Sequence, residues 1–283
     1  MRVLSIQSAV TYGHVGNSAA VFPLQRLGHE AMPIYTVTFS NHTGYGHWRG
    51  RVAAADEIRE IVTGVDERGQ LGAVDMILSG YLGNPDIADV IIETVQKVKQ
   101  KNPDARYALD PVMGNAETGC VVDPSIPRII KERALSVADI VSPNQFELGF
   151  LTDTEPHTLP EILDSVALLQ ERGPHTVLVT SVKRPDRPEG TLEVLAVDGD
   201  SAWIVQTPQL PITLSGTGDT VMSLFIGNLG NTGSVATALE NAVSGVYGVL
   251  EETLAAGEHE LRLVEAQDRF AHPRREFTAR QVK

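Results

Sequence analysis

The tetrapeptide Gly216-Thr217-Gly218-Asp219 stands directly before an apolar segment, Val221 to Leu229, that predicts a helix. Two glycines let the backbone turn its N–H groups inward, and the N-terminus of the following helix adds partial positive charge, which predicts an anion hole. The same dipole favours an ionised Asp219, which could take a proton from a hydroxyl beside a bound phosphate. The alternative is that Asp219 only starts the helix and the glycines only shape a turn.

A second acid, Asp110, ends a predicted strand in the segment Leu109-Asp110-Pro111-Val112-Met113-Gly114. Ligands of open α/β sheets bind beyond the carboxyl ends of strands, where such an acid can reach a metal ion or a phosphate-bound water. Asp before Pro is also a common turn former, so a purely structural role is the alternative.

A third feature, Pro143-Asn144-Gln145-Phe146-Glu147, again follows a predicted strand. Asn144 and Glu147 would share one face of a helical turn and offer a neutral oxygen and a carboxylate suited to Mg²⁺ and its waters. A capping box, with Asn144 at the N-cap and Glu147 three residues on, is the alternative. Together the three features predict phosphoryl transfer: Mg²⁺ held by acids, an anion hole at a helix N-terminus and a base beside it.

Other nucleotide and metal motifs are excluded. The P-loop pattern needs Gly-Lys before Ser or Thr, and the chain contains no Gly-Lys pair. The dinucleotide fingerprint G-x-G-x-x-G fails, because Gly216 and Gly218 match its first two glycines but Val221 stands at the position of the third. The single cysteine, Cys120, excludes an intrachain disulfide and a cysteine-based zinc site.

Composition points to a globular protein with a strong acidic excess. The 283 residues are 42% hydrophobic and 21% charged, and 23 Lys and Arg against 36 Asp and Glu give a net charge of −13. This balance argues against nucleic acid and anionic membrane surfaces as partners. No apolar run approaches the roughly 18 residues of a membrane span, and no signal peptide is evident, so we expect a cytoplasmic protein.

Short apolar runs alternate with segments of helical period, which predicts an α/β fold with a mostly parallel sheet and helices on both faces. Strands without helices between Thr176 and Thr207 predict an antiparallel edge. The last third predicts helices, including one near Glu260 to Phe270. No linker or composition break divides the chain, so we expect one domain over residues 1–270 and a polar, basic tail over residues 271–283.

The glycine loop and Asn144-x-x-Glu147 resemble the two signatures of the ribokinase-like superfamily, whose members phosphorylate hydroxymethyl groups of small molecules. The segments Ser5-Ile6-Gln7-Ser8, Phe39-Ser40-Asn41-His42-Thr43-Gly44-Tyr45 and Leu109 to Gly114 are similar to pyridoxal kinases of the type shared by bacteria and eukaryotes. The likeness runs from Arg2 to about Leu254. It implies a ribokinase-like three-layer α/β/α sandwich, and a homodimer is expected from the family.

The resemblance also implies a substrate side and a nucleotide side. Ser8 would hydrogen-bond the pyridine ring of the vitamin, and Asp219 would deprotonate its 5′-hydroxymethyl group while Gly216, Thr217 and Gly218 hold the transferring phosphoryl group. The pocket would be lined by Val15, Thr43, Gly44 and Tyr81. The remaining implied residues serve Mg²⁺ and ATP: Asp110, Asn144 and Glu147 for the metal and phosphates, Ser142 and Thr180 near the phosphates or a monovalent cation, and Thr207, Pro208, Gln209 and Leu210 in a loop over the nucleotide.

The sequence therefore predicts ATP-dependent phosphorylation of pyridoxal to pyridoxal 5′-phosphate. One alternative is another hydroxymethyl kinase of the superfamily, for example one acting on hydroxymethylpyrimidine. The other is a non-catalytic protein that binds vitamin B6, against which stands the full set of acids Asp110, Glu147 and Asp219.

Overall fold

The computed structural model describes residues 1–274 and 276–283. Its main sheet consists of β1 (Arg2–Val10), β2 (Glu30–Phe39), β3 (Gly50–Val52), β4 (Met76–Ser79), β5 (Arg106–Leu109), β8 (Ile140–Val141), β9 (Thr176–Val182), β10 (Thr191–Asp198), β11 (Ser201–Pro208) and β12 (Arg280–Gln281). A small separate hairpin is formed by β6 (Gly114–Asn115) and β7 (Gly119–Cys120). The helices are α1 (Asn17–Arg26), α2 (Ala55–Glu67), α3 (Pro85–Lys101), α4 (Ser125–Ile129), α5 (Gln145–Thr152), α6 (Leu159–Gln170), α7 (Thr217–Thr232), α8 (Val235–Ala256) and α9 (Gln267–Ala271).

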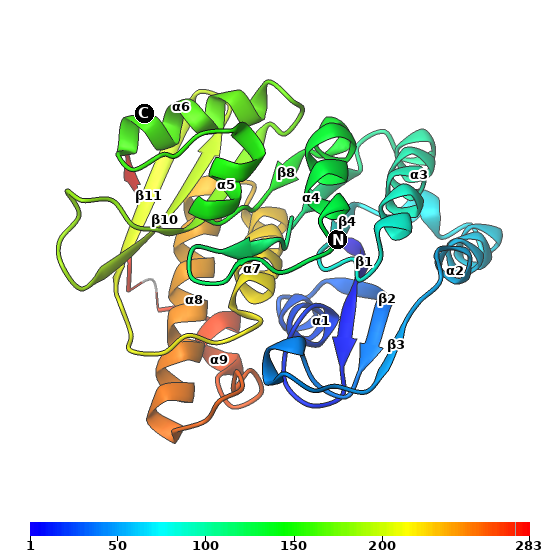
Figure 1. Cartoon of the computed structure of the whole chain (residues 1–283), viewed down its shortest axis with the longest axis horizontal. Coiled ribbons are helices and arrows are strands. Elements are labelled where there is room, and N and C mark those ends of the chain that lie inside the picture. The colour runs from blue at the N-terminus through cyan, green and yellow to red at the C-terminus, as the bar shows by residue number, and fades with distance from the viewer. Residues whose placement is uncertain (275) are drawn as a thin grey trace.

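The strands of the main sheet follow the order β12-β11-β10-β9-β8-β5-β4-β1-β2-β3 (Figure 1). From β9 to β2 all neighbours are parallel. At one edge β10, β11 and β12 pair antiparallel, and at the other β3 pairs antiparallel with β2. The predicted mostly parallel sheet with an antiparallel edge is therefore confirmed, and β3 adds a second antiparallel edge that the sequence pattern did not predict.

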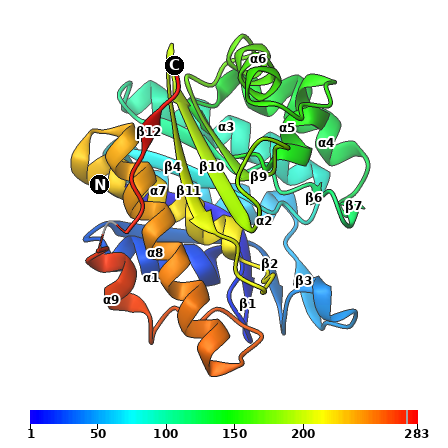
Figure 2. The same ribbon diagram turned by 90° about the vertical axis from the view of Figure 1, so that its left-hand side faces the viewer.

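Helices cover both faces of this sheet, so the molecule has three layers. Successive residues of β4 point to opposite faces, and Met76 and Leu78 accordingly belong to a different core from Ile77. The core around Ile77 also contains residues of α2, α3, α5 and α6, whereas the other contains residues of α1, α7 and α8. Figure 2 shows these two groups of helices on either side of the strands. Burial on both faces explains the continuous apolar runs of the inner strands.

Two expectations for the C-terminal region differ from the structure. The helix predicted near Glu260 to Phe270 is confined to α9, and Glu260 lies in the connection that leads from α8 to α9. The segment expected as a polar tail ends in β12, which pairs with Trp203 and Ile204 of β11. Val282 then packs against the core of the α2, α3, α5 and α6 face. The division of the chain at residue 270 stays a prediction.

The side-chain amide of Asn17 holds β1 at the point where its regular hydrogen bonding with β2 is interrupted. The register between β1 and β2 shifts around Ser8. Asn17, 3% exposed at the start of α1, donates from Nδ2 to the carbonyl oxygens of Ser5 (3.3 Å), Gln7 (3.2 Å) and Ile34 (3.0 Å). Buried carbonyl groups need a donor, and Asn17 supplies one to both strands. It thereby fixes the backbone on either side of Ser8.

We expect Asn17→Asp to lower the free energy of unfolding by about 3 kcal/mol at pH 8, and Asn17→Ala by about 2 kcal/mol. A carboxylate cannot donate, and it would face three carbonyl oxygens, whereas alanine only leaves them unpaired. Urea unfolding measures both values. Asn231→Asp is the control, because the Asn231 amide also donates to a carbonyl oxygen (Leu27, 3.0 Å) but is exposed. An Asn17→Asp protein as stable as Asn17→Ala would contradict this role.

Candidate active site

The carboxyl ends of neighbouring parallel strands bring the predicted nucleotide residues to one edge of the sheet. The Asp110 N–H donates to the carbonyl of Ser79 at the end of β4 (2.9 Å), and the Ser142 N–H donates to Leu109 at the end of β5 (3.0 Å). Thr180 in β9 is joined to the segment after β8 by a further backbone hydrogen bond of 3.0 Å. Asp110, Ser142 and Thr180 therefore stand in a row across three strands, as the strand assignments predicted.

The glycine loop approaches this row from the N-terminus of α7. Gly216 has a φ of 83°, and a Cβ atom at this position would overlap the carbonyl oxygen of His14, so only glycine fits here. A Cβ at Gly218 would lie 4.0 Å from Oδ2 of Asp110. The Thr217 hydroxyl donates to the carbonyl of Leu214 (3.0 Å). The first N–H groups of α7, which have no partner within the helix, thus lie beside Asp110.

Three carboxylates from distant parts of the chain share this edge. Asp110 and Glu147 are 7% and 4% exposed. Burial raises the pKa of Asp110 well above its usual range, and the negative charges of Asp219 and Glu147 raise it further. Burial also raises the pKa of Asp219 and of Glu147, although backbone N–H groups facing each carboxylate offset part of the effect. The site concentrates negative charge that a cation would relieve.

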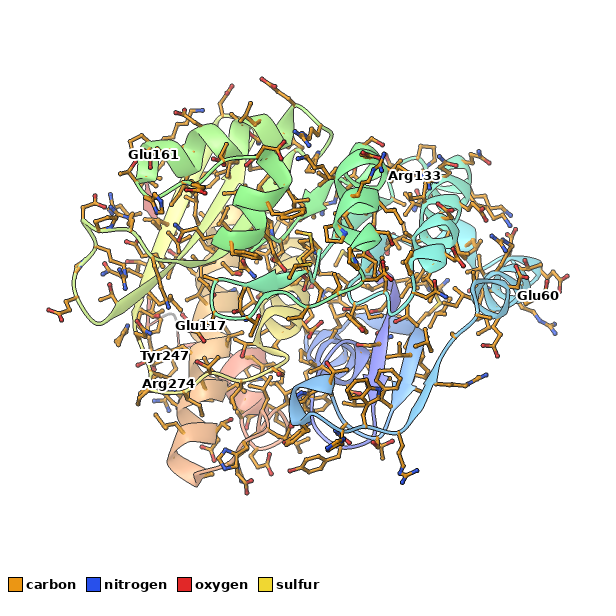
Figure 3. All side chains as sticks on the ribbon, in the orientation of Figure 1. Glu60, Glu117, Arg133, Glu161, Tyr247 and Arg274 are labelled. Atoms are coloured by element: carbon orange, nitrogen blue, oxygen red, sulfur yellow. The ribbon has the colours of Figure 1, made fainter. Side chains whose placement is uncertain are left out.

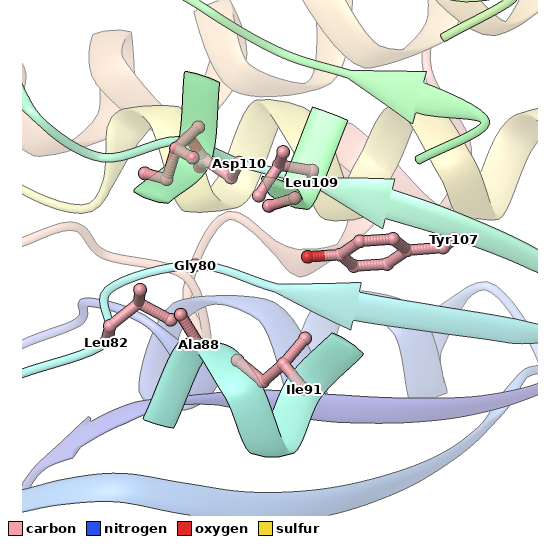
Figure 4. Close-up of a pocket in the computed structure, with 9 residues that line it drawn as sticks. Gly80, Leu82, Ala88, Ile91, Tyr107, Leu109 and Asp110 are labelled. Carbon is pink, nitrogen blue, oxygen red and sulfur yellow. The ribbon is translucent and has the colours of Figure 1, made fainter. Parts of the chain in front are cut away.

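Apolar packing beneath Asp110 accounts for much of this desolvation. Asp110 lies at a narrow cavity whose walls include Leu82, Ile91 and Leu109 (Figure 4). The cavity also touches Tyr107, whose hydroxyl hydrogen-bonds the Ser79 hydroxyl at 2.7 Å. Among the residues that the structure describes, none with a cationic side chain lines the cavity. Asp110 thus has an apolar floor on one side and faces the glycine loop on the other.

The capping-box alternative for Asn144 and Glu147 is what the structure shows. Asn144 Oδ1 accepts from the Glu147 N–H, and Glu147 Oε2 accepts from the Asn144 N–H, both at 2.9 Å. Glu147 Oε1 accepts from the N–H groups of Met113 (2.7 Å) and Gly114 (3.3 Å), and Asn144 Nδ2 donates to the Gly114 carbonyl (2.8 Å). The pair therefore ties the segment after β5 to α5. Its predicted role toward Mg²⁺ stays a prediction, and these hydrogen bonds favour contact through water.

The donor set nevertheless fits a magnesium ion that substrate phosphates share. In the described residues, no three His, Cys, Asp or Glu side chains are grouped so as to hold a metal ion. Mg²⁺ commonly takes one or two carboxylates, several waters and phosphate oxygens rather than a cage of side chains. The Asp110 carboxylate faces the N–H of Val112, a β-branched residue with a strained φ of 38°. Asp110 is thus the carboxylate least engaged by protein donors.

The predicted substrate residues lie on the other side of Asp219. A Cβ at Gly16 would overlap Ser8 Oγ, and the Gly16 N–H faces the Asp219 carboxylate. Gly16 therefore brings Ser8, which is 4% exposed, next to the proposed base. Its φ of 52° and this close packing give Gly16 a structural role at the site that its sequence context alone did not predict.

The other residues that were predicted to line the substrate pocket come from three separate segments. Val15 is half-buried in the loop before α1, and Thr43 and Gly44 form an exposed turn after β2. A Cβ at Gly44 would lie 3.8 Å from Ser215 Oγ, which places this turn beside the glycine loop. Tyr81, half-buried after β4, accepts a hydrogen bond at its carbonyl from the Thr36 hydroxyl of β2 (2.7 Å).

The predicted nucleotide loop follows β11 at the antiparallel edge. Thr207 is buried in β11 and Pro208 ends that strand, so only Gln209 and Leu210 of the predicted loop lead from it toward the glycine loop. The Gln209 N–H donates to the carbonyl of Gly190, at the turn between β9 and β10 (2.7 Å). These residues surround the same sheet edge, and their contacts with a nucleotide stay predictions.

Comparisons with known proteins agree with this geometry. A family model described as phosphomethylpyrimidine kinase matches residues 25–263. The chain is 57% identical over 282 residues to a pyridoxal kinase of Leifsonia xyli subsp. xyli and 48% identical over 282 residues to one of Corynebacterium diphtheriae, with 100% of each chain covered. The chain belongs to the pyridoxal kinase family. The sequence-based assignment is thereby confirmed.

Pyridoxal kinase structures share the whole fold. The pyridoxal kinase of Leishmania donovani in complex with ADP and pyridoxamine has a TM-score of 0.93 and 28% identity, covering 100% of this chain and 99% of that chain. The predicted ribokinase-like sandwich is therefore confirmed. Within the described residues, no helix has the length and apolar character needed to cross a membrane.

The acidic excess of this chain is largely a property of its outer surface. Exposed acids such as Glu60 on α2 and Glu161 on α6 point outward from the helices (Figure 3). At the carboxyl edge, by contrast, the N–H groups at the start of α7 offer positive potential at short range. A polyanion can therefore bind at this edge although the net charge is −13.

We expect Asp110→Asn to stabilise the metal-free protein increasingly as pH rises from about 4 to 8. The pKa of Asp110 is higher in the folded protein than in the unfolded chain, so the unfolded chain binds fewer protons in this window and the stability of the wild type falls as pH rises. Asparagine keeps an acceptor for the Val112 N–H and carries no charge. The expected gain at pH 8 is on the order of 1 kcal/mol, about 2 °C in Tm.

Thermal unfolding at several pH values, with EDTA present, measures this gain. Asp104→Asn is the matched control, because Asp104 is exposed shortly before β5. A gain that is absent, or equal at pH 4 and pH 8, would show that Asp110 is not held in a repulsive, desolvated state.

Proposed function

We propose that this member of the pyridoxal kinase family transfers the γ-phosphoryl group of ATP to the 5′-hydroxymethyl group of pyridoxal. The observation that carries the proposal is the position of Asp219. It lies in the first turn of α7, with Gly16 and Ser8 on one side and Gly218 and Asp110 on the other. A hydroxyl held at Ser8 and a phosphate held at the glycine loop would meet at this carboxylate.

Asp219 acts as the general base. It accepts the proton of the hydroxymethyl group while the oxygen attacks the γ-phosphorus in line and the bond to ADP breaks, which gives pyridoxal 5′-phosphate and ADP. Burial raises the pKa of Asp219 and so makes it a stronger base than an exposed aspartate. The N–H groups of Thr217 and Gly218 receive the charge of the transferring phosphoryl group, with Gly216 setting the turn.

Asp110 would hold Mg²⁺ together with the ATP phosphates, and Glu147 and Asn144 would support the ion through waters. When bound, Mg²⁺ neutralises charge on the phosphates and the leaving group. Ser142 and Thr180 lie near the phosphates or a monovalent cation. We also propose that the protein is a homodimer, which is expected from the family resemblance. A cytoplasmic location is proposed from the sequence.

A second candidate is phosphorylation of hydroxymethylpyrimidine, which the description of the matching family model favours. Pyridoxal is preferred because full-length relatives at 57% and 48% identity are pyridoxal kinases. The proposal predicts ADP release with pyridoxal and a kcat/KM for hydroxymethylpyrimidine at least about a hundredfold lower, equivalent to roughly 2.7 kcal/mol. A higher kcat/KM for hydroxymethylpyrimidine would reverse the assignment, and background ADP release with both would favour a non-catalytic binding protein.

Asp219→Asn should lower kcat by about a thousandfold while the KM for ATP changes less than about twofold, because the amide cannot accept the proton but occupies the same space. Steady-state kinetics with pyridoxal and Mg-ATP measures both parameters. The control is Asp200→Asn in the exposed turn between β10 and β11. Turnover near that of the wild type would exclude Asp219 as the base.

A further inference from the structure

One half-buried carboxylate near the substrate side has no role in the function proposed above. Glu260 lies in the connection between α8 and α9, and its side chain is 11% exposed. This connection is anchored to α8, because the Arg262 N–H donates to the Thr253 hydroxyl (3.1 Å) and the Glu258 N–H to the Thr253 carbonyl (3.2 Å). Thr253 is itself fully buried. Glu260 therefore projects from a fixed support.

Both oxygens of Glu260 are engaged by segments that line the predicted pocket. Oε1 accepts from the Tyr45 hydroxyl (2.7 Å) and lies 3.2 Å from Nε2 of His42. In the sequence these two residues stand directly on either side of Thr43 and Gly44. The hydrogen bond to Glu260 also raises the pKa of Tyr45, which therefore stays a donor. Oε2 accepts from the backbone N–H of His14 (3.1 Å), next to Val15. One carboxylate thus joins the turn after β2 to the loop before α1.

The same connection reaches the glycine loop. The carbonyl of His14, whose N–H Glu260 binds, occupies the space where Gly216 would carry a Cβ, and Leu261 Cδ1 lies 3.3 Å from that position. Gly13 has a φ of 90°, which favours glycine, and a Cβ there would overlap the Glu260 carboxylate in its present position. Glu260 and Leu261 therefore contact the substrate-side loops and, through them, the loop that faces the phosphoryl group.

We propose that Glu260 is a positioning residue for phosphoryl transfer: it holds the Thr43–Gly44 turn and the Gly13–Val15 loop in register with the glycine loop. Glu260 acts through Tyr45, His42 and His14 and does not take part in the chemical step. Positioning contributes to catalysis because a reacting group displaced by about 1 Å can lose on the order of a hundredfold in rate. This inference rests on the proposed function, since it assigns the turn to pyridoxal binding.

Glu260→Ala should raise the KM for pyridoxal about tenfold or more, because charge-assisted hydrogen bonds to two loops are lost, while the KM for ATP changes less than about twofold. Glu260→Gln keeps one oxygen acceptor and the side-chain volume, so its KM for pyridoxal should lie between those of the wild type and Glu260→Ala. The matched control is Glu258→Ala in the same connection, because the Glu258 side chain is 55% exposed and lies 3.9 Å from Arg262, away from the two loops that Glu260 binds. It should leave both KM values unchanged.

Tyr45→Phe removes a single donor to Glu260 and keeps the ring, so it tests the same contact if Glu260→Ala does not fold. Its effect on the KM for pyridoxal should have the same direction, and combined with Glu260→Gln the two effects should be less than additive. A KM for pyridoxal within about twofold of the wild type in Glu260→Ala, with only a lower Tm, would overturn the inference and leave a structural role. Wild-type protein without activity on pyridoxal would instead refute the proposed function, so the two failures are distinguishable.

Discussion

The constraint on which the site depends is the gathering of carboxylates in a place that water hardly reaches. Asp110 and Glu147 are brought to one sheet edge by parallel strands that end together, and Asp219 is brought there by the N-terminus of α7. Their mutual repulsion and burial raise the pKa of Asp110 well above its usual range. Such an arrangement costs stability in the free protein, and a bound cation with phosphates would relieve it. The fold therefore keeps these carboxylates desolvated and close together, which favours binding of a cation with phosphates.

Close backbone approach is what allows three loops to converge on Asp219. Gly16 packs against Ser8, and Gly216 packs against the carbonyl of His14, in both cases where a side chain would collide. Asn17 fixes the strand on either side of Ser8, and the connection from α8 to α9 supports the loop that contains His14. The substrate side and the phosphate side are consequently one packed unit rather than two independent loops. Backbone N–H groups held in this way could bind an anion even though the net charge of the protein is −13.

The sequence predicted what local patterns encode. Buried strands, amphipathic helices and the glycine loop before α7 were recognisable because each depends on neighbouring residues, and the row from Asp110 to Thr180 follows from strands that end at one edge. The sequence left the role of Asn144 and Glu147 open between a magnesium site and a capping box, because the same spacing suits both. The role of Glu260 was not predictable, since it contacts His14 across 246 residues, and such a contact leaves no local pattern. β12 was missed for the same reason: a short polar segment pairs only because β11 offers an open edge.

The central prediction is that Asp110 stays protonated well above the usual pH range of an aspartate until a cation and phosphates bind, because burial raises its pKa. A carbon-13 NMR titration of aspartate side-chain carboxyl groups in the metal-free protein measures this directly, with Asp110→Asn to assign the signal. We expect one carboxyl signal that titrates well above the value of about 4 that is usual for aspartate and that disappears in the variant. The same signal should titrate lower when Mg²⁺ and a non-hydrolysable ATP analogue are added. An Asp110 signal that titrates near 4 in the metal-free protein would contradict it.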